Sequence, residues 1–122
     1  MDLKGYTGQI LEVNLSSKEI KTIPTDEDLA KKFVGGAGYA CAYIYPKIEK
    51  DTDPLGPENI MMFMTGPLAG TMATSGGRMV VCAKSPYTEI WGESNCGSHV
   101  CVKLKKAGYD GIILKGKSED LV

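Results

Sequence analysis

Hydrophobic and polar positions alternate along two short runs near the start of the chain. In residues 9–15 the apolar residues Leu11, Val13 and Leu15 alternate with polar ones. This period of two is typical of a half-buried strand. A second alternating run, residues 19–23, follows a polar turn and stops at a proline. The pattern predicts a β-hairpin.

Two short helices are expected next. Thr25 is predicted as the N-cap of the first helix, with Asp28 in the capping-box position three residues later. This helix is expected to run to about Phe33, where two glycines end it. A second helix is predicted from Gly38 to Tyr45 and ends before a proline. Its side chains are apolar or aromatic nearly all round, which favours a buried helix.

Apolar runs separated by turns make up the rest of the chain. Continuous apolar runs bounded by turns predict buried strands. The expected elements are strands at 60–64, 79–83 and 111–115, a weaker strand at 89–93, and a helix at 98–107 with Gly108 as its C-cap. The order is roughly β-β-α-α-β-β-β-α-β. It predicts a single α+β domain over residues 1–122, with a mixed or antiparallel sheet and a few short helices.

Residues 66–97 carry the strongest chemical signal. Gly76 and Gly77 directly precede Arg78, and glycines without a Cβ let the backbone approach a ligand closely. Free N–H groups and a planar guanidinium both suit phosphate oxygens. The segment Asn95–Gly97 leads into the predicted helix, whose N-terminus is a second anion site. Two such turns suggest a ligand with more than one phosphate, although a glycine-rich turn alone is usually only a turn.

Composition narrows the class of protein. The chain has 122 residues, 43% of them hydrophobic, which is enough for one domain with a real core. A net charge of −1 gives no basic surplus for nucleic-acid binding. No run approaches the roughly 20 apolar residues of a membrane span. Because the first eight residues lack a signal-peptide core, a cytoplasmic location with cysteines as thiols is expected.

Other candidate sites are weaker. Asp51 and Asp53 could bind a metal, but a solvated turn is favoured because no EF-hand spacing follows. His99, the only histidine, could relay a proton, although a structural role in the first turn of a helix is favoured. Cys96 and Cys101 lack the C-x₂-C spacing of iron–sulfur ligands. No metal site and no catalytic residue are therefore predicted in this chain.

Several short motifs, each present once, follow one another along nearly the whole length of the chain. They are GQILEVNL at 8–15, FVGG at 33–36, DPLGPEN at 53–59, GPLAG at 66–70, SGGR at 75–78, KSP at 84–86 and AGYDG at 107–111. Together they resemble the N-terminal region of the aldehyde:ferredoxin oxidoreductase family, the tungsten-pterin enzymes. The resemblance implies the fold of the first half of a duplicated N-terminal domain.

The resemblance also implies a cofactor. In that family this region is the base on which a bis-molybdopterin with tungsten or molybdenum sits, with magnesium bridging the two phosphates. The family arginine falls on Arg78, and the family asparagine and glycine fall on Asn95 and Gly97. These three residues are expected to contact the cofactor together with Gly76 and Gly77.

The function that the resemblance implies belongs to a longer enzyme. The family oxidises aldehydes to carboxylic acids with ferredoxin as electron acceptor, and its [4Fe–4S] ligands lie beyond Val122. The chain alone is therefore expected to be inactive and to need the remainder of the oxidoreductase or a companion subunit. Ser98 and His99 depart from the glycine and the aromatic residue that the family often has there, which puts close approach of the backbone to phosphate in doubt.

Two alternatives stay open at this point. A non-catalytic module could keep the fold and hold an anion, and an assembly subunit could use only its surface. A half-domain is also expected to expose apolar surface that the rest of the enzyme would cover, so the isolated chain is expected to self-associate as a homo-oligomer.

Overall fold

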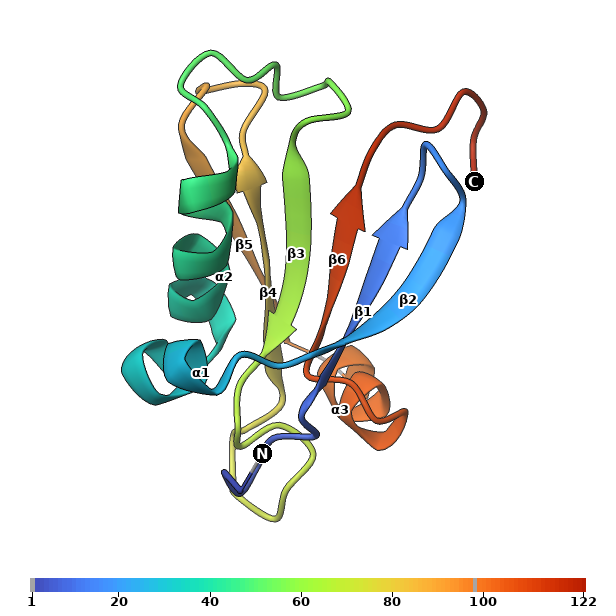
Figure 1. Ribbon diagram of the computed structural model, residues 1–122. Helices are drawn as coiled ribbons and strands as arrows, with labels where there is room; N and C mark the ends of the chain where they lie inside the picture. The colour runs from blue at the N-terminus through green and yellow to red at the C-terminus, as the bar shows by residue number, and fades with distance from the viewer. Residues whose placement is uncertain (1, 98) are drawn as a thin grey trace.

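A six-stranded sheet runs through residues 2–97 and 99–122, which are the residues that the computed structural model describes (Figure 1). In chain order the elements are strands β1 Gln9–Asn14 and β2 Glu19–Pro24, helices α1 Glu27–Phe33 and α2 Gly36–Ile44, the 3₁₀ turn η1 Tyr45–Lys47, strands β3 Ile60–Thr65, β4 Arg78–Lys84 and β5 Trp91–Gly97, helix α3 His99–Lys106 and strand β6 Gly111–Lys115. The predicted order and the α+β class are confirmed.

The last strand of the chain lies in the middle of the sheet. The strand order is β2-β1-β6-β3-β4-β5. β6 pairs parallel with β1 and antiparallel with β3, and the remaining neighbours are antiparallel. The sheet is therefore mixed, as predicted, and β2 and β5 are its edge strands.

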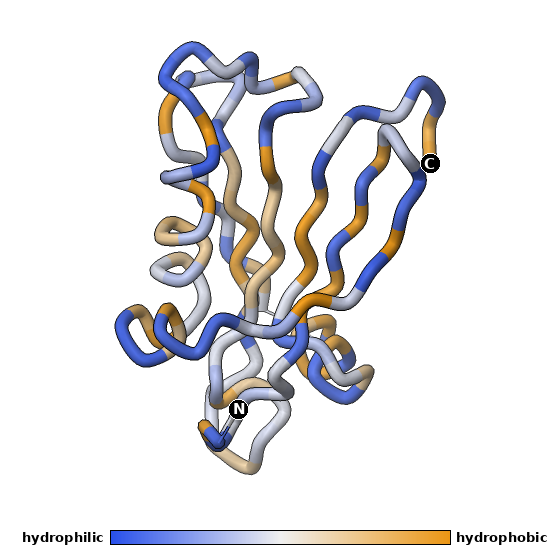
Figure 2. Tube along the Cα trace, viewed as in Figure 1, coloured by the Kyte–Doolittle hydropathy of each residue, from blue (hydrophilic) through white to orange (hydrophobic). Residues whose placement is uncertain are grey.

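Helices lie on both faces of this sheet (Figure 1). The larger core lies between the sheet and α1 and α2; the smaller one lies under α3 on the other face. Apolar positions concentrate along the central strands (Figure 2). Because side chains alternate along a strand, Val80 and Cys82 of β4 face the larger core, whereas Met79 faces the smaller one. The same alternation places Arg78, at the start of β4, on the α2 face.

The hairpin of β1 and β2 is confirmed, from Gln9 opposite Pro24 to Asn14 opposite Glu19. The buried side of this hairpin includes one charged residue, Glu12, which is only 5% exposed. Its carboxylate pairs with Lys21 at 3.1 Å and Lys115 at 2.8 Å. Burial alone would raise the pKa of Glu12, but the hydrogen bonds from the two lysines outweigh it and lower that pKa.

Both helix starts on the α2 face differ from the prediction. Asp26, not Thr25, is the N-cap of α1, and its carboxylate accepts from the backbone N–H of Leu29 at 3.0 Å. The prediction of Thr25 as cap and of Asp28 in the capping box was wrong, because the Thr25 hydroxyl instead donates to Asp110. α2 begins at Gly36, two residues earlier than predicted. Its C-terminal end continues into the 3₁₀ turn at Pro46, where the missing N–H of a first-turn proline is tolerated.

β5 and α3 also differ from their predicted bounds. β5 pairs with β4 along its whole length, from Trp91 opposite Lys84 to Gly97 opposite Arg78. The predicted bounds 89–93 for this strand were therefore wrong, because Asn95–Gly97, which were expected to lead into the helix, complete β5. α3 begins at His99, one residue after the predicted start. The predicted departure at Ser98 lies outside the described residues. Gly108, with φ +96°, follows α3 as predicted.

A buried carboxylate ties distant parts of the chain together at one end of the sheet. Asp110, 2% exposed, accepts hydrogen bonds from the backbone N–H groups of Thr7 and Gly8, both at 2.9 Å. It also accepts from the Thr25 hydroxyl at 2.7 Å and pairs with the ammonium of Lys105 at 2.6 Å. Burial alone would raise the pKa of Asp110, but these hydrogen bonds outweigh it and lower the pKa. This cluster gives a structural reason for the AGYDG motif.

Candidate functional site

The candidate site lies where β4 begins and β5 ends. Arg78 and Gly97 stand directly opposite each other in the β4–β5 ladder. Arg78 is exposed. A Cβ added to Gly97 would lie 3.9 Å from Nη2 of Arg78. The guanidinium therefore reaches across to the glycine, and a side chain at position 97 would occupy the space beside it.

Asn95 lies on the same face as this pair. It stands opposite Val80, two residues along from Arg78, and directly opposite residues share one face of a sheet. Asn95 is exposed, and its amide donates to Glu93 across a long 3.4 Å. The other oxygen of the Glu93 carboxylate accepts from the indole N–H of Trp91 at 3.3 Å. The sheet thus brings the predicted residues Arg78, Asn95 and Gly97 together. The carboxylate of Glu93 follows on the same face, two residues from Asn95 along β5.

The loop before Arg78 supplies the two remaining predicted residues. Gly77 is exposed and directly precedes β4. A Cβ on Gly76 would lie 2.6 Å from the carbonyl oxygen of Leu68. Packing within the loop therefore gives Gly76 a structural reason to lack a side chain, separate from the closeness of a ligand. Ser75, with φ +61°, occupies the left-handed region beside it.

Sequence reasoning missed one neighbour of this site, the first turn of α2. A Cβ on Gly36 would lie 3.8 Å from Cγ2 of Val80, so the helix begins over the strand that carries Arg78. No side-chain hydrogen bond caps α2 at Gly35. The N–H groups of a first helical turn lack partners within the helix and attract anions. The signal was present in the sequence as glycines at positions 35, 36 and 38, but we interpreted the first two only as the end of α1.

The weaker candidates take structural or surface positions. Asp53 accepts from the backbone N–H of Leu55 at 2.9 Å, as in a turn. His99 is exposed at the first residue of α3. Cys41 and Cys96 are exposed, while two further cysteines are buried. Across residues 2–97 and 99–122, no group of three or more His, Cys, Asp or Glu side chains is placed to hold a metal ion.

No helix within the described residues combines the length and apolar character needed to cross a membrane.

The profile of the aldehyde ferredoxin oxidoreductase N-terminal domain matches residues 10–122, and the chain belongs to this family. The resemblance inferred from the motifs is thereby confirmed.

Two relatives show the breadth of the family. The tungsten-containing aldehyde ferredoxin oxidoreductase of Pyrococcus horikoshii is 43% identical over 115 residues, which are 94% of this chain and 19% of that protein. The aliphatic sulfonate oxidoreductase WOR-like subunit of Pyrococcus furiosus is 36% identical over 120 residues, 96% of this chain and 19% of that protein. The chain spans about a fifth of the length of these relatives.

A solved structure supports the same assignment. The active-site complex BamBC of benzoyl-coenzyme A reductase, solved with 1,5-dienoyl-CoA, contains a chain with the same fold at a TM-score of 0.94 and 36% identity. The match covers 98% of this chain and 18% of that one. The predicted fold is confirmed, and relatives of this domain occur both within long enzymes and in a subunit of a complex.

Proposed function

We propose that this chain is the first half of a duplicated N-terminal domain that holds a bis-molybdopterin cofactor with tungsten or molybdenum. The observation that carries the proposal is the placement of Arg78 opposite Gly97, with Asn95 on the same face. Family membership and the tungsten named for the Pyrococcus relatives support this cofactor. Gly76 and Gly77 complete the set as the loop that delivers Arg78.

The donors at this site suit the phosphate groups of such a cofactor. Arg78 is the only arginine in the sequence, and a guanidinium binds phosphate oxygens through two parallel hydrogen bonds. The long bond from Asn95 to Glu93 leaves the amide able to turn toward a ligand. The first turn of α2 adds positive backbone dipole. Because Glu93 repels an anion, Arg78 is expected to dominate binding, and magnesium would neutralise further phosphate charge.

The complete enzyme would carry out the redox chemistry. In this proposal the cofactor, when bound, supplies electron transfer for the oxidation of aldehydes to carboxylic acids, with ferredoxin as the acceptor. The [4Fe–4S] ligands and the substrate-contacting residues would lie in the remainder of the oxidoreductase or in a companion subunit. This chain contributes binding and orientation, and it is inactive alone.

A pyrophosphate titration followed by amide NMR tests the site. We expect shifts centred on Gly76, Gly77, Arg78 and Gly97. Arg78→Ala should weaken binding roughly tenfold or more, since a charge-assisted contact contributes about 1.5–3 kcal/mol. Lys103→Ala, which removes an exposed cation of α3 on the other face, is the matched control and should bind as the wild type does. Shifts elsewhere, or none at millimolar ligand, would argue against the proposal.

A further inference from the structure

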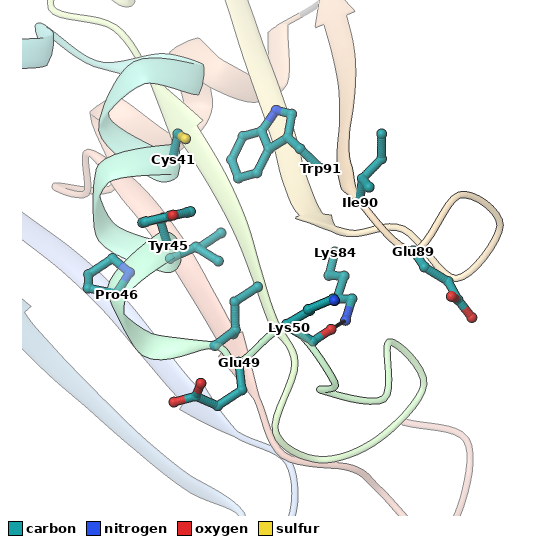
Figure 3. A pocket seen from close by; sticks show the side chains of 11 residues that line it. Cys41, Tyr45, Pro46, Glu49, Lys50, Lys84, Glu89, Ile90 and Trp91 are labelled. Atoms are coloured by element: carbon teal, nitrogen blue, oxygen red, sulfur yellow. Dashed lines mark hydrogen bonds between the residues drawn. The ribbon is translucent and has the colours of Figure 1, made fainter.

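A cavity of about 570 Å³ opens at the other end of β4 and β5, between the C-terminal end of α2 and the start of β5 (Figure 3). Its volume lies within the roughly 300–1,000 Å³ typical of small-molecule sites. Lys84 lines it and stands six residues from Arg78 along β4, about 20 Å away. The cavity is therefore separate from the proposed phosphate site.

The walls of this cavity are mostly apolar. They are formed by Ile44, Tyr45, Pro46, Ile48, Ile90 and Trp91, with Cys41 on the α2 side. Tyr45 is 81% exposed and Ile90 67% exposed. Figure 3 shows Tyr45 on the α2 side of this space and the Trp91 ring on the β5 side, directed toward α2. A bound apolar group would remove part of this surface from water. The hydrophobic effect would then be the main source of affinity for an apolar ligand.

A buried cation lies in the same cavity. Lys84 is 8% exposed, and its ammonium donates to the carbonyl oxygens of Lys50 at 2.5 Å and Thr52 at 2.8 Å. An ammonium has three N–H donors, so one remains for a ligand. No carboxylate in the described part of the chain forms an ion pair with Lys84. A buried charge without a counter-ion is costly, so an anionic ligand would gain from meeting it.

The other charges at the cavity do not supply this counter-ion. Glu49 and Glu89 line it and are exposed, and both direct their carboxylates away from it (Figure 3). We propose that the cavity binds a small organic carboxylate with an aromatic or aliphatic body, the carboxylate on Lys84 and the body between Tyr45 and Trp91. Lys84 is the one buried ammonium among mostly apolar walls, with Lys50 exposed at the rim, and this suits a monoanion better than a multiply charged phosphate.

Phenylacetate is the probe that tests this site. Trp91 is the only tryptophan in the sequence, so its fluorescence reports on the cavity directly. We expect a saturable fluorescence change with phenylacetate. Phenylacetamide has nearly the same shape without the charge and should bind roughly tenfold more weakly or worse. Equal binding of acid and amide, or a change that never saturates, would overturn the proposal.

A variant at the mouth of the cavity avoids disturbing the fold. Lys84→Met would also remove two hydrogen bonds that hold residues 50–52, and its result would mix binding with stability. Ile90→Glu instead adds a repelling carboxylate at an exposed position, and it should weaken phenylacetate binding about tenfold. Ile20→Glu on β2, 66% exposed in the wild type, is the matched control and should leave affinity unchanged. Unchanged affinity in Ile90→Glu would contradict the assignment.

A carboxylate could also come from a polypeptide, and a second probe separates the two sources. The dipeptide amide N-acetyl-Phe-Glu-NH₂ carries the same aromatic ring and a single carboxylate on a peptide backbone. Weaker binding of this peptide than of phenylacetate supports a site for a free acid. Tighter binding would assign the cavity to a partner polypeptide and overturn the small-molecule proposal.

Discussion

Replacing Asp110 with asparagine should destabilise the fold strongly. Asp110→Asn keeps the shape of the side chain but removes the charge that meets Lys105 at 2.6 Å. Lys105 is 9% exposed, and of its two hydrogen-bond acceptors it would keep the carbonyl oxygen of Gly5, at 2.7 Å, while losing the carboxylate charge. Removing one partner of a buried ion pair costs about 3–5 kcal/mol, because the other charge stays buried.

That loss is large against the total. At about 0.05–0.15 kcal/mol per residue, a chain of this length has a free energy of unfolding of about 6–18 kcal/mol. The variant should therefore lose a substantial fraction of its stability, and its Tm should fall by about 10 °C or more. The measurement is urea unfolding followed by circular dichroism at pH 7. Asp120→Asn, at an exposed position near the C-terminus, is the control and should change stability by less than about 0.5 kcal/mol.

The difference between wild type and Asp110→Asn should also depend on pH. The pKa of Asp110 is lowered in the folded chain from its ordinary value of 3.8. Its ionised form therefore stabilises the fold above pH 3.8, and this contribution is lost as the pH falls through the folded pKa. The difference should be constant from pH 7 to about pH 5 and shrink below pH 4. A loss under 1 kcal/mol at pH 7, or one equally large in acid, would refute the reasoning.

Two further predictions test packing and thiol accessibility. Gly111→Ala should cost about 1–3 kcal/mol in unfolding experiments, because its Cβ would meet the Met64 sulfur and lie 2.7 Å from the carbonyl oxygen of Phe63. Gly66→Ala, where a Cβ would meet nothing within 4 Å, is the control; equal costs at both positions would contradict the packing argument. Cys41 and Cys96 should react quickly with Ellman's reagent at pH 8, because both are exposed. Cys82 should react slowly, because burial, with the nearby Glu93 and Cys41, raises the pKa of its thiol to about 11. Rapid loss of the Cys82 thiol, located by mass spectrometry, would show that the strand is more open than described.

Apolar runs predicted most of the sheet because burial itself determines their pattern. Strands β3, β4 and β6 are apolar over most of their length, and most of their residues are buried or half-buried. The predicted strand ended too early, at residue 93, because Glu93–Gly97 of β5 is mostly polar and exposed. Backbone pairing with β4, rather than side-chain burial, holds this part of β5 in the sheet. Edge strands of this kind leave little hydrophobic signal.

The candidate site shows the same limit. Arg78 and the glycines before it could be singled out from residue types alone. Their closeness to Gly97 depends on the register between two strands, whereas Asn95–Gly97 were expected to lead into a helix rather than to pair as a strand. The Thr25 cap failed for a related reason, since the competing partner Asp110 lies 85 residues away in the chain. Long-range partners of this kind cannot be identified from local patterns.

The central position of β6 has a consequence for how the chain folds during synthesis. β6 joins the β2–β1 hairpin to the β3–β4–β5 half of the sheet, yet it is made after the other five strands of this sheet. Once the first hundred residues have left the ribosomal exit tunnel, both halves are exposed without the strand that unites them. Synthesis at about 5–20 residues per second therefore leaves two apolar sheet edges open for seconds. Chaperone binding in that interval would depend on residues 111–115, and a chain stopped before them should aggregate.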